Sequence, residues 1–297
     1  MIRIKYFVMA LILLMLGCSD NSSDTNVPIT PGTIDFSECT IPTESNTLDI
    51  VSWNLKNFPF TFQTLDLVKG ILESLDADVI ALQEIRSIND FEELVNQLQG
   101  WEGRVLTFGN STQRLAYLYK TKEITLIEPV THLFSENTDE MNEAFTSVRR
   151  PLHARFQHRN GLNFRIVNVH LKCCDGSEDR RRKALNKIKQ KIDNEWFLDP
   201  VVVLGDFNDE LVDVDNVFDL FLNDATNFSF TTLPIAQGNS SNWSFPSWPS
   251  HLDHILITDE LFNKELTTET LRFSACFAGY TTSISDHRPV MIRLESN

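Results

Sequence analysis

From residue 48 onward, hydrophobic positions follow two periods that alternate along the chain. Apolar runs predict strands over 48–53, 78–82, 115–120, 124–133, 152–156, 164–170, 201–204, 252–257 and 289–294. Apolar side chains at helical spacing predict helices over 65–75, 88–98 and 178–196. Strands interspersed with helices, several of them in succession between residues 115 and 170, favour an α/β layered sandwich with a long antiparallel portion. The sequence has no internal repeat and no linker after residue 47, so we predict one domain over 48–297.

The N-terminal residues carry a different pattern. Two basic residues precede an unbroken apolar run over 6–16, which is too short to span a bilayer comfortably and is typical of a signal peptide. Gly17-Cys18 follows directly and resembles a bacterial lipobox, in which the cysteine is lipidated. We therefore predict a signal peptide over 1–17, a lipid anchor on Cys18 and a polar tether over 18–47. This predicts a lipid-anchored place in the bacterial cell envelope, facing the periplasm or the exterior. The alternative is a plain secretory signal with an incidental cysteine.

Composition and charge narrow the class of protein. The chain of 297 residues is 42% hydrophobic, which excludes a collagen-like, low-complexity or wholly disordered protein. Its 26 basic and 41 acidic side chains give a formal charge of −15. This balance argues against a protein that grips nucleic acid or anionic membrane by bulk electrostatics. It does not exclude an enzyme that reaches a phosphate substrate through a metal ion.

Four cysteines remain once Cys18 is assigned to lipid, namely Cys39, Cys173, Cys174 and Cys276. An exported compartment permits disulfides, and four cysteines allow three pairings, which the sequence leaves open. Cys173-Cys174 lacks the spacing of a zinc half-site, so a disulfide or inert thiols are the sensible interpretations.

Polar side chains gather where the predicted strands begin or end. They occur in the segments Trp53-Asn54, Gln83-Glu84, Val169-His170-Leu171, Gly205-Asp206-Phe207-Asn208, Leu252-Asp253-His254-Ile255 and Ser285-Asp286-His287-Arg288-Pro289-Val290. Polar groups at the ends of apolar strands are the usual layout of an active site on a rigid scaffold. Singly, each residue has a bland structural interpretation; together they point to a site.

In their order and local context, these six segments resemble the endonuclease/exonuclease/phosphatase superfamily over residues 48–294. Gly205-Asp206-Phe207-Asn208 and Ser285-Asp286-His287 are the most specific parts of the match. The resemblance implies a four-layer α/β sandwich, in which two packed mixed sheets are flanked by helices. It also implies a monomeric enzyme that hydrolyses phosphate esters with water and a divalent metal, usually Mg²⁺, with Mn²⁺ as the alternative.

The resemblance also implies the role of each metal-site residue. Glu84 is the main carboxylate ligand, with Asn54 beside it, and Asp286 helps to hold metal or water. Mg²⁺ prefers oxygen ligands and needs only one or two carboxylates, which agrees with this set.

The catalytic roles come from the same match. Asp206 orients or deprotonates the attacking water, and Asn208 binds a phosphate oxygen or fixes Asp206. His287 contacts the scissile phosphate and is steered by Asp253. His170 donates to the phosphate or to the leaving oxygen. Cations and donors of this kind stabilise the negative charge of a phosphodiester transition state.

Within the superfamily, the sequence leans toward the secreted pancreatic-type deoxyribonucleases. The match makes Arg149 and Arg86 candidates for phosphate contact. It departs from that branch at Gln113, where a carboxylate would pair with His170, and at Ser111, where a tyrosine is expected. We therefore expect an exported nuclease, with a phosphodiesterase or phosphatase acting on a small or lipid phosphoester as the alternative.

Overall fold

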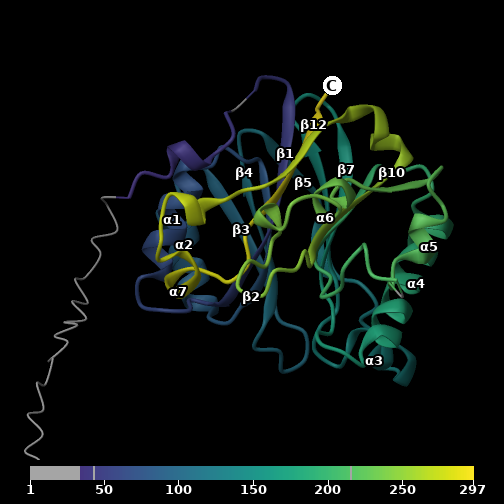
Figure 1. Ribbon diagram of the computed structural model, residues 1–297. Coiled ribbons are helices and arrows are strands. Elements are labelled where there is room, and N and C mark those ends of the chain that lie inside the picture. The colour runs from purple at the N-terminus through teal and green to yellow at the C-terminus, as the bar shows by residue number, and fades with distance from the viewer. Residues whose placement is uncertain (1–33, 43, 215) are drawn as a thin grey trace, which may run out of the picture. The chain divides into compact units, whose positions relative to one another are not determined.

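Two six-stranded mixed sheets pack against each other and form the centre of the fold (Figure 1). The computed structural model describes residues 34–42, 44–214 and 216–297. The first sheet has the order β11 (Glu265–Thr270), β12 (Val290–Glu295), β1 (Thr47–Phe58), β2 (Val79–Ile85), β4 (Arg114–Lys120), β3 (Trp101–Leu106). The second has the order β5 (Ile124–His132), β6 (Leu152–His158), β7 (Asn163–His170), β8 (Val201–Asp206), β10 (Asp253–Thr258), β9 (Phe228–Phe230).

Helices cover the outer faces of both sheets. Figure 1 shows α1 (Thr64–Ser74), α2 (Ile88–Gln97) and α7 (Tyr280–Ser283) on one side, and α3 (Asp139–Phe145), α4 (Glu178–Glu195) and α5 (Asp219–Leu222) on the other. The short α6 (Leu233–Ala236) and 3-10 turns at Ser37–Cys39, Ser240–Asn242, Asp259–Lys264 and Phe273–Ala275 complete the described elements. The predicted four-layer sandwich is therefore confirmed.

The strand β8 shows why the sequence forms this layered fold. All six of its residues are buried, because one face meets the other sheet and the opposite face meets helices. Val202 and Leu204 belong to the core between the sheets, whereas Val201 and Val203 pack in the second core, which also contains Leu185 of α4. A strand with two apolar faces reads as a continuous hydrophobic run, and that is the pattern from which it was predicted.

A polar bridge joins the two sheets inside the first core. The Gln83 side chain of β2 donates to Asn168 Oδ1 of β7 over 2.9 Å, and Asn168 Nδ2 donates to the Leu82 carbonyl over 3.0 Å. Both amides are completely buried, so each hydrogen bond avoids the cost of an unpaired polar group. The bridge fixes β2 against β7 one position before Glu84 and two positions before His170, both residues of the predicted site.

The N-terminal part of the described chain is attached to the domain. Phe36 is buried and packs edge-on against Phe273, and Cys39 forms a disulfide with Cys276. The described part of the predicted tether, from residue 34 onward, therefore lies on the fold. Cys18 and the predicted signal peptide lie outside the described residues. Over the ranges that the structure describes, none of the helices is long and apolar enough to cross a membrane.

Candidate active site

Strand register places three of the predicted site residues side by side in the second sheet. His170 on β7 pairs with Asp206 on β8, and Asp206 pairs in turn with Asp253 on β10. The first sheet meets this row through Asn54 of β1, the last residue before the strand becomes irregular, whose Nδ2 atom donates to Asp206 Oδ2 over 3.0 Å. The same amide donates to Glu84 Oε1 over 3.2 Å. Residues from both sheets thus converge at one edge of the sandwich, as predicted.

The backbone around the site adopts conformations that most side chains avoid. Lys56, Asn57, Glu84 and Asn208 all have positive φ, between 43° and 61°. Such conformations persist only where the surrounding structure determines them, and they gather at functional sites. Here the irregular pairing of β1 and β2 after Asn54 brings the Asn57 amide within 3.0 Å of Glu84 Oε2, which fixes the Glu84 carboxylate.

Gly205 carries a related constraint at the His170–Asp206 pair. Its φ is +142°, and a Cβ atom at this position would lie 2.0 Å from the Val169 carbonyl oxygen. Only glycine lets β7 and β8 approach closely enough here to hold His170 beside Asp206.

Asp253 and His287 form a buried ion pair. His287 Nδ1 donates to Asp253 Oδ2 over 2.7 Å, and His287 Nε2 lies 4.0 Å from Asp206 Oδ2. Burial alone would lower the pKa of His287, but the carboxylates of Asp253 and Asp206 outweigh it and raise the pKa to about 10. His287 is therefore an imidazolium at neutral pH, as the predicted contact with a phosphate requires.

The pKa of Asp206 is also raised, which for a carboxylate favours the neutral form. Burial raises its pKa to about 7, although the His287 cation and the Asn54 amide act against that rise. The backbone N–H of Asn208 donates to Asp206 Oδ1 over 2.9 Å, and Asn208 Nδ2 donates to the Leu171 carbonyl over 3.1 Å. A general base with a pKa near 7 combines availability with proton affinity at neutral pH. Asn208 thus fixes Asp206, one of its two predicted roles.

His170 has an arginine as its neighbour where the resemblance implied a carboxylate. Arg149 Nη1 lies 3.2 Å from His170 Nε2, and Arg149 Nη2 donates to Gln113 Oε1 over 2.7 Å. Burial, followed by the Arg149 charge, lowers the pKa of His170 well below its ordinary value. His170 is therefore neutral at neutral pH, and the positive charge beside it is that of the Arg149 side chain.

The predicted metal-site residues offer oxygen donors of the kind that Mg²⁺ prefers. Glu84 is half-buried with its carboxylate fixed by Asn54 and Asn57, and it can still accept further ligation. Asn54 turns its amide nitrogen toward Glu84 and Asp206, while its oxygen accepts from the Lys56 N–H over 2.9 Å. Asp286 pairs with Lys56 over 3.0 Å. The Glu84 carboxylate is of the kind that a hard cation prefers, Asp286 is engaged by Lys56, and Asn54 in this orientation positions Glu84.

Two cationic residues, Lys56 and the predicted Arg86, lie at the margin of the site. Arg86 follows Glu84 by two positions, and its side chain is exposed. Lys56, which follows Asn54 by two positions, also lies over the Phe60 ring at 4.4 Å. Cationic side chains thus border the ends of β1 and β2.

Two side chains that hydrogen-bond to the His287 backbone were not among the residues predicted from the sequence. Tyr280 O–H donates to the His287 carbonyl over 2.7 Å and accepts from Trp53 Nε1 over 3.0 Å. Ser285 Oγ donates to the Asn54 carbonyl over 2.6 Å and accepts from the His287 N–H over 3.0 Å. Ser285 stood within a recognised motif, but nothing in the local sequence distinguished Tyr280 from a core aromatic residue.

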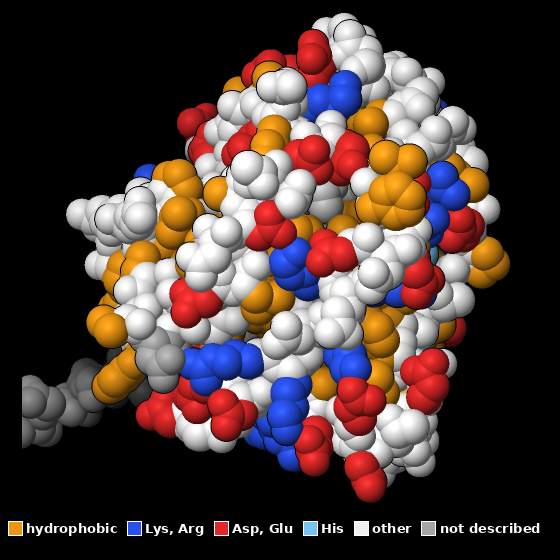
Figure 2. All heavy atoms as spheres, turned by 90° about the vertical axis from the view of Figure 1, so that its right-hand side faces the viewer, with side chains coloured by type: hydrophobic (Ala, Val, Ile, Leu, Met, Phe, Trp, Pro, Cys, Tyr) orange, Lys and Arg blue, Asp and Glu red, His pale blue; other side chains and the backbone are white. Residues whose placement is uncertain are grey.

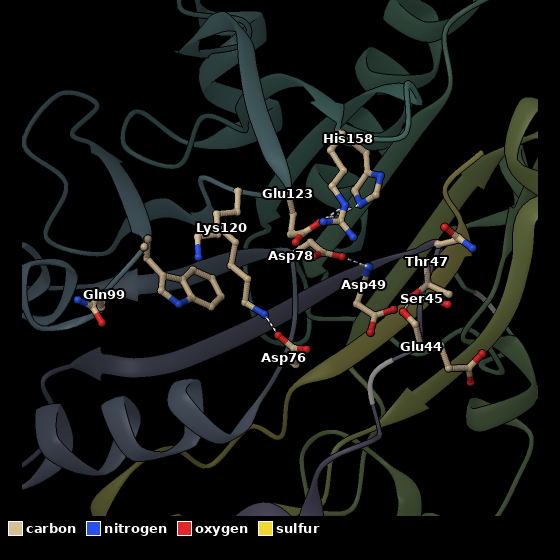
Figure 3. A pocket seen from close by; sticks show the side chains of 15 residues that line it. Glu44, Ser45, Thr47, Asp49, Asp76, Asp78, Gln99, Lys120, Glu123 and His158 are labelled. Atoms are coloured by element: carbon tan, nitrogen blue, oxygen red, sulfur yellow. Dashed lines mark hydrogen bonds and ion pairs between the residues drawn. The ribbon is translucent and has the colours of Figure 1, made fainter.

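A separate cavity lies away from this site, at the N-terminal end of β1. It has a volume of about 820 Å³ and contains Asp78, Glu123 and His158 close together (Figure 3). His158 Nδ1 accepts from the Asn160 N–H over 3.2 Å, so the imidazole proton sits on Nε2, 3.9 Å from Glu123. A protonated nitrogen cannot bind a cation, and we assign no metal to this cluster.

Basic side chains in the first turns of α4 form ion pairs with acidic side chains. Arg181 pairs with Asp209 over 2.7 Å, and Lys183 pairs with Glu143 over 2.6 Å. Figure 2 shows acidic and basic side chains interspersed over the described residues of the face that carries α4 and α5. This face therefore lacks the single-sign charge that a polyanion groove would require.

Comparison with known proteins agrees with this geometry. Three solved structures share the fold at low sequence identity. The human Nocturnin catalytic domain is 18% identical, with a TM-score of 0.65 over 86% of this chain and 95% of that one. A humanized D. rerio TDP2 is 16% identical, with a TM-score of 0.64 over 84% and 99%. A mannosyl-6-phosphatase of Bacteroides thetaiotaomicron is 17% identical, with a TM-score of 0.61 over 83% and 99%.

No curated protein matches the sequence. Residues 51–287, which include every catalytic and metal-site candidate, match the Endonuclease/Exonuclease/phosphatase family. The chain belongs to this family, whose members hydrolyse phosphoester bonds and generally depend on a divalent metal.

Proposed function

We propose that the protein is an exported, Mg²⁺-dependent phosphodiesterase with nucleic acid as its first substrate class. The observation that carries this proposal is the cluster formed by Asp206, Asp253 and His287. It sets a buried imidazolium 4.0 Å from a carboxylate whose pKa is about 7. Hydrolysis of a phosphodiester uses both groups, because the cation stabilises the charge that develops on the phosphate and the carboxylate takes a proton from the attacking water.

The other site residues act on the same reaction. Arg149, held by Gln113 and the Leu171 carbonyl, supplies a second positive charge toward the phosphate oxygens. Neutral His170 lies 3.6 Å from Asp206 and helps to orient that carboxylate. A divalent cation held by Glu84 would add positive charge that stabilises the transition state.

Two observations support nucleic acid and export. Cationic Lys56 and Arg86 border the site, where they could contact the backbone of a bound strand, and the similar D. rerio TDP2 has been solved with a single-strand DNA product. The disulfide between Cys39 and Cys276 is typical of an oxidising, extracytoplasmic compartment. Together with the lipobox-like Gly17-Cys18, this supports an enzyme that is lipid-anchored in the bacterial cell envelope, and we propose that it acts as a monomer.

A second candidate is a phosphodiesterase or phosphatase that acts on a small or lipid phosphoester. It is favoured by the net charge of −15 and by Gln113 in place of a carboxylate. One of the similar structures is a mannosyl-6-phosphatase. A small substrate would need only the charges inside the site and no basic surface around it.

The test is purified protein incubated with plasmid DNA, RNA, sphingomyelin, sugar phosphates and a generic diester, each with Mg²⁺, Mn²⁺ or excess chelator. We expect cleavage of a nucleic acid that chelator abolishes and Mg²⁺ restores. The Glu84→Gln variant should require far more metal, whereas Glu123→Gln, in the remote cavity, should behave as the unchanged protein does. Full activity in excess chelator would refute the metal mechanism. Cleavage of the small esters alone would select the second candidate.

A further inference from the structure

Two adjacent cysteines lie in the loop that leaves the active site. The strand β7 ends at His170, and Cys173 and Cys174 follow after two residues, before α4 begins. Both are free thiols in this structure, and their Sγ atoms are 2.7 Å apart, which is closer than unbonded sulfur atoms pack and within about 0.7 Å of a disulfide bond. Cys174 is exposed and has a φ of +78°, so the backbone already adopts a turn that holds the two side chains together.

The catalytic residues hold the first part of this loop. The Leu171 carbonyl accepts hydrogen bonds from Arg149 Nη1 over 3.0 Å and from Asn208 Nδ2 over 3.1 Å. Arg149 is the cation beside His170, and Asn208 fixes Asp206. A shift of Leu171 would therefore disturb both.

A buried arginine holds the second part. Arg181 Nη1 donates to the Lys172 carbonyl over 2.8 Å and to the Cys174 carbonyl over 3.2 Å. Its Nε atom donates to Asp209 over 2.7 Å, next to Asn208 in the chain. The cysteine pair thus lies between two sets of hydrogen bonds. One set includes Asn208, which binds Asp206, and the other includes Asp209, which follows Asn208 in the chain.

The surroundings favour oxidation of the pair. The disulfide between Cys39 and Cys276 shows that the fold accommodates oxidised cysteines. Lys172 Nζ lies 3.7 Å from Cys173 Sγ, so a cationic side chain stands beside the pair. Because Cys174 is exposed, an oxidant can reach the pair.

We propose that Cys173 and Cys174 close a vicinal disulfide that regulates the active site. The Cys173 thiolate attacks a disulfide oxidant, either a small molecule or a protein, and forms a mixed disulfide as one thiol leaves. Cys174 then loses its proton, and its sulfur attacks that of Cys173. The second thiol leaves as the bond forms, so the chain gives up two protons and two electrons and the oxidant becomes two thiols.

Leu171 contacts Arg149 and Asn208 while the two sulfurs lie 2.7 Å apart, and the disulfide would keep the sulfurs at such a close spacing. In the reduced protein, the unbonded sulfurs separate to their normal contact distance and loosen the loop. Small displacements of positioning groups slow catalysis, so we expect reduction to lower turnover about threefold to tenfold.

Peptide mapping tests the bond without relying on activity. The full chain is treated with oxidised glutathione, alkylated without reduction and digested with trypsin, which releases residues 173–180 as one peptide. We expect this peptide to be unalkylated and lighter than the dithiol by two hydrogen masses. Low dithiothreitol should open it before the half-buried Cys39–Cys276 bond, because exposed disulfides are the more labile ones. Two alkyl groups, or stable glutathione adducts on both sulfurs, would overturn the proposal.

Turnover tests the regulatory part. The double variant Cys173→Ser/Cys174→Ser should have the turnover of the reduced enzyme and should not respond to dithiothreitol. Cys174→Ser should keep glutathione on Cys173, because no second sulfur can displace it. If the bond forms in peptide mapping while oxidised and reduced enzyme have equal turnover, the regulatory part of the proposal is wrong. If the protein hydrolyses none of the esters above, the proposed function fails, and peptide mapping still decides the disulfide.

Discussion

The substitution Asp253→Asn removes the charge that holds His287 in its cationic form. The two side chains are 2.7 Å apart, and Asp253 is completely buried, so water cannot replace the carboxylate. The pKa of His287 is about 10, against an ordinary 6.5. This difference corresponds to about 5 kcal/mol in favour of the imidazolium, after the opposing effect of burial.

Asp206, 4.0 Å from the ring, supplies only part of that stabilisation. Loss of half or more of the 5 kcal/mol leaves a buried histidine that titrates near or below neutral pH, and asparagine can also reverse its tautomer. We expect turnover to fall on the order of 10²–10⁴-fold, as for other orienting aspartates. The pH profile should change as well. The unchanged enzyme gains activity as Asp206 deprotonates near pH 7 and loses it as His287 deprotonates near pH 10, whereas the variant should lose activity at lower pH.

The assay is turnover of Asp253→Asn, His287→Ala and the double variant on one diester, with thermal melts as a folding control. The two losses should be far from additive, because the residues act as a unit. Asp49→Asn is a matched control, since it breaks another buried ion pair, with Arg293, at the opposite end of β1. It should lower stability and leave turnover unchanged. Additive losses, or a folded Asp253→Asn enzyme with near-normal turnover, would refute the reasoning.

Three further predictions concern stability. Gly205→Ala should destabilise the fold by about 3–5 kcal/mol, because its Cβ would clash with the Val169 carbonyl at a strained φ; urea melts measure this, and an unchanged midpoint would contradict it. Burial raises the pKa of Asp78 to about 7. Between about pH 4 and pH 7 the native protein therefore keeps a proton that the unfolded chain has lost, so the free energy of unfolding decreases as the pH rises through this window. Asp78→Asn should therefore stabilise by about 2–4 kcal/mol at pH 8 and by almost nothing at pH 3, and equal effects at both would refute this. Replacing Cys39 and Cys276 by alanine should cost about 5 kcal/mol in urea melts, from a sequence separation of 237. A loss below about 1 kcal/mol would contradict the loop-entropy argument.

The strands with two buried faces could be predicted from the sequence, because their hydrophobic runs are continuous. The strands β3, β9 and β11 were missed. In β3 and β11 half-buried and exposed positions mix, and β9 has only three residues. The strand β1 also runs to Phe58, beyond the predicted end at residue 53, because its irregular segment continues to pair with β2.

The candidate site could be predicted where a motif lies within a few residues of a strand end. Asp206 and Asn208 are an example, since the turn that joins them is local. Contacts between distant segments could not be predicted in the same way. The Arg149–His170 neighbourhood depends on the pairing of β6 with β7, and the support of His287 by Tyr280 depends on the turn over 280–287; no hydrophobic pattern encodes either contact.

The disulfide between Cys39 and Cys276 decides where mechanical force enters the fold. A pull on the chain before residue 34 reaches Cys39 first and crosses a covalent bond to the segment that precedes α7. The connection over residues 40–46 and the hydrogen bonds that begin β1 therefore do not carry the first share of the tension. If the N-terminal anchor proposed above holds the protein, tension would reach the fold at a point close in sequence to Ser285 and His287. Without this one bond, the same pull would meet the packing of Phe36 on Phe273 and the hydrogen bonds from Arg293 to Pro42 and Glu44 before it reached β1.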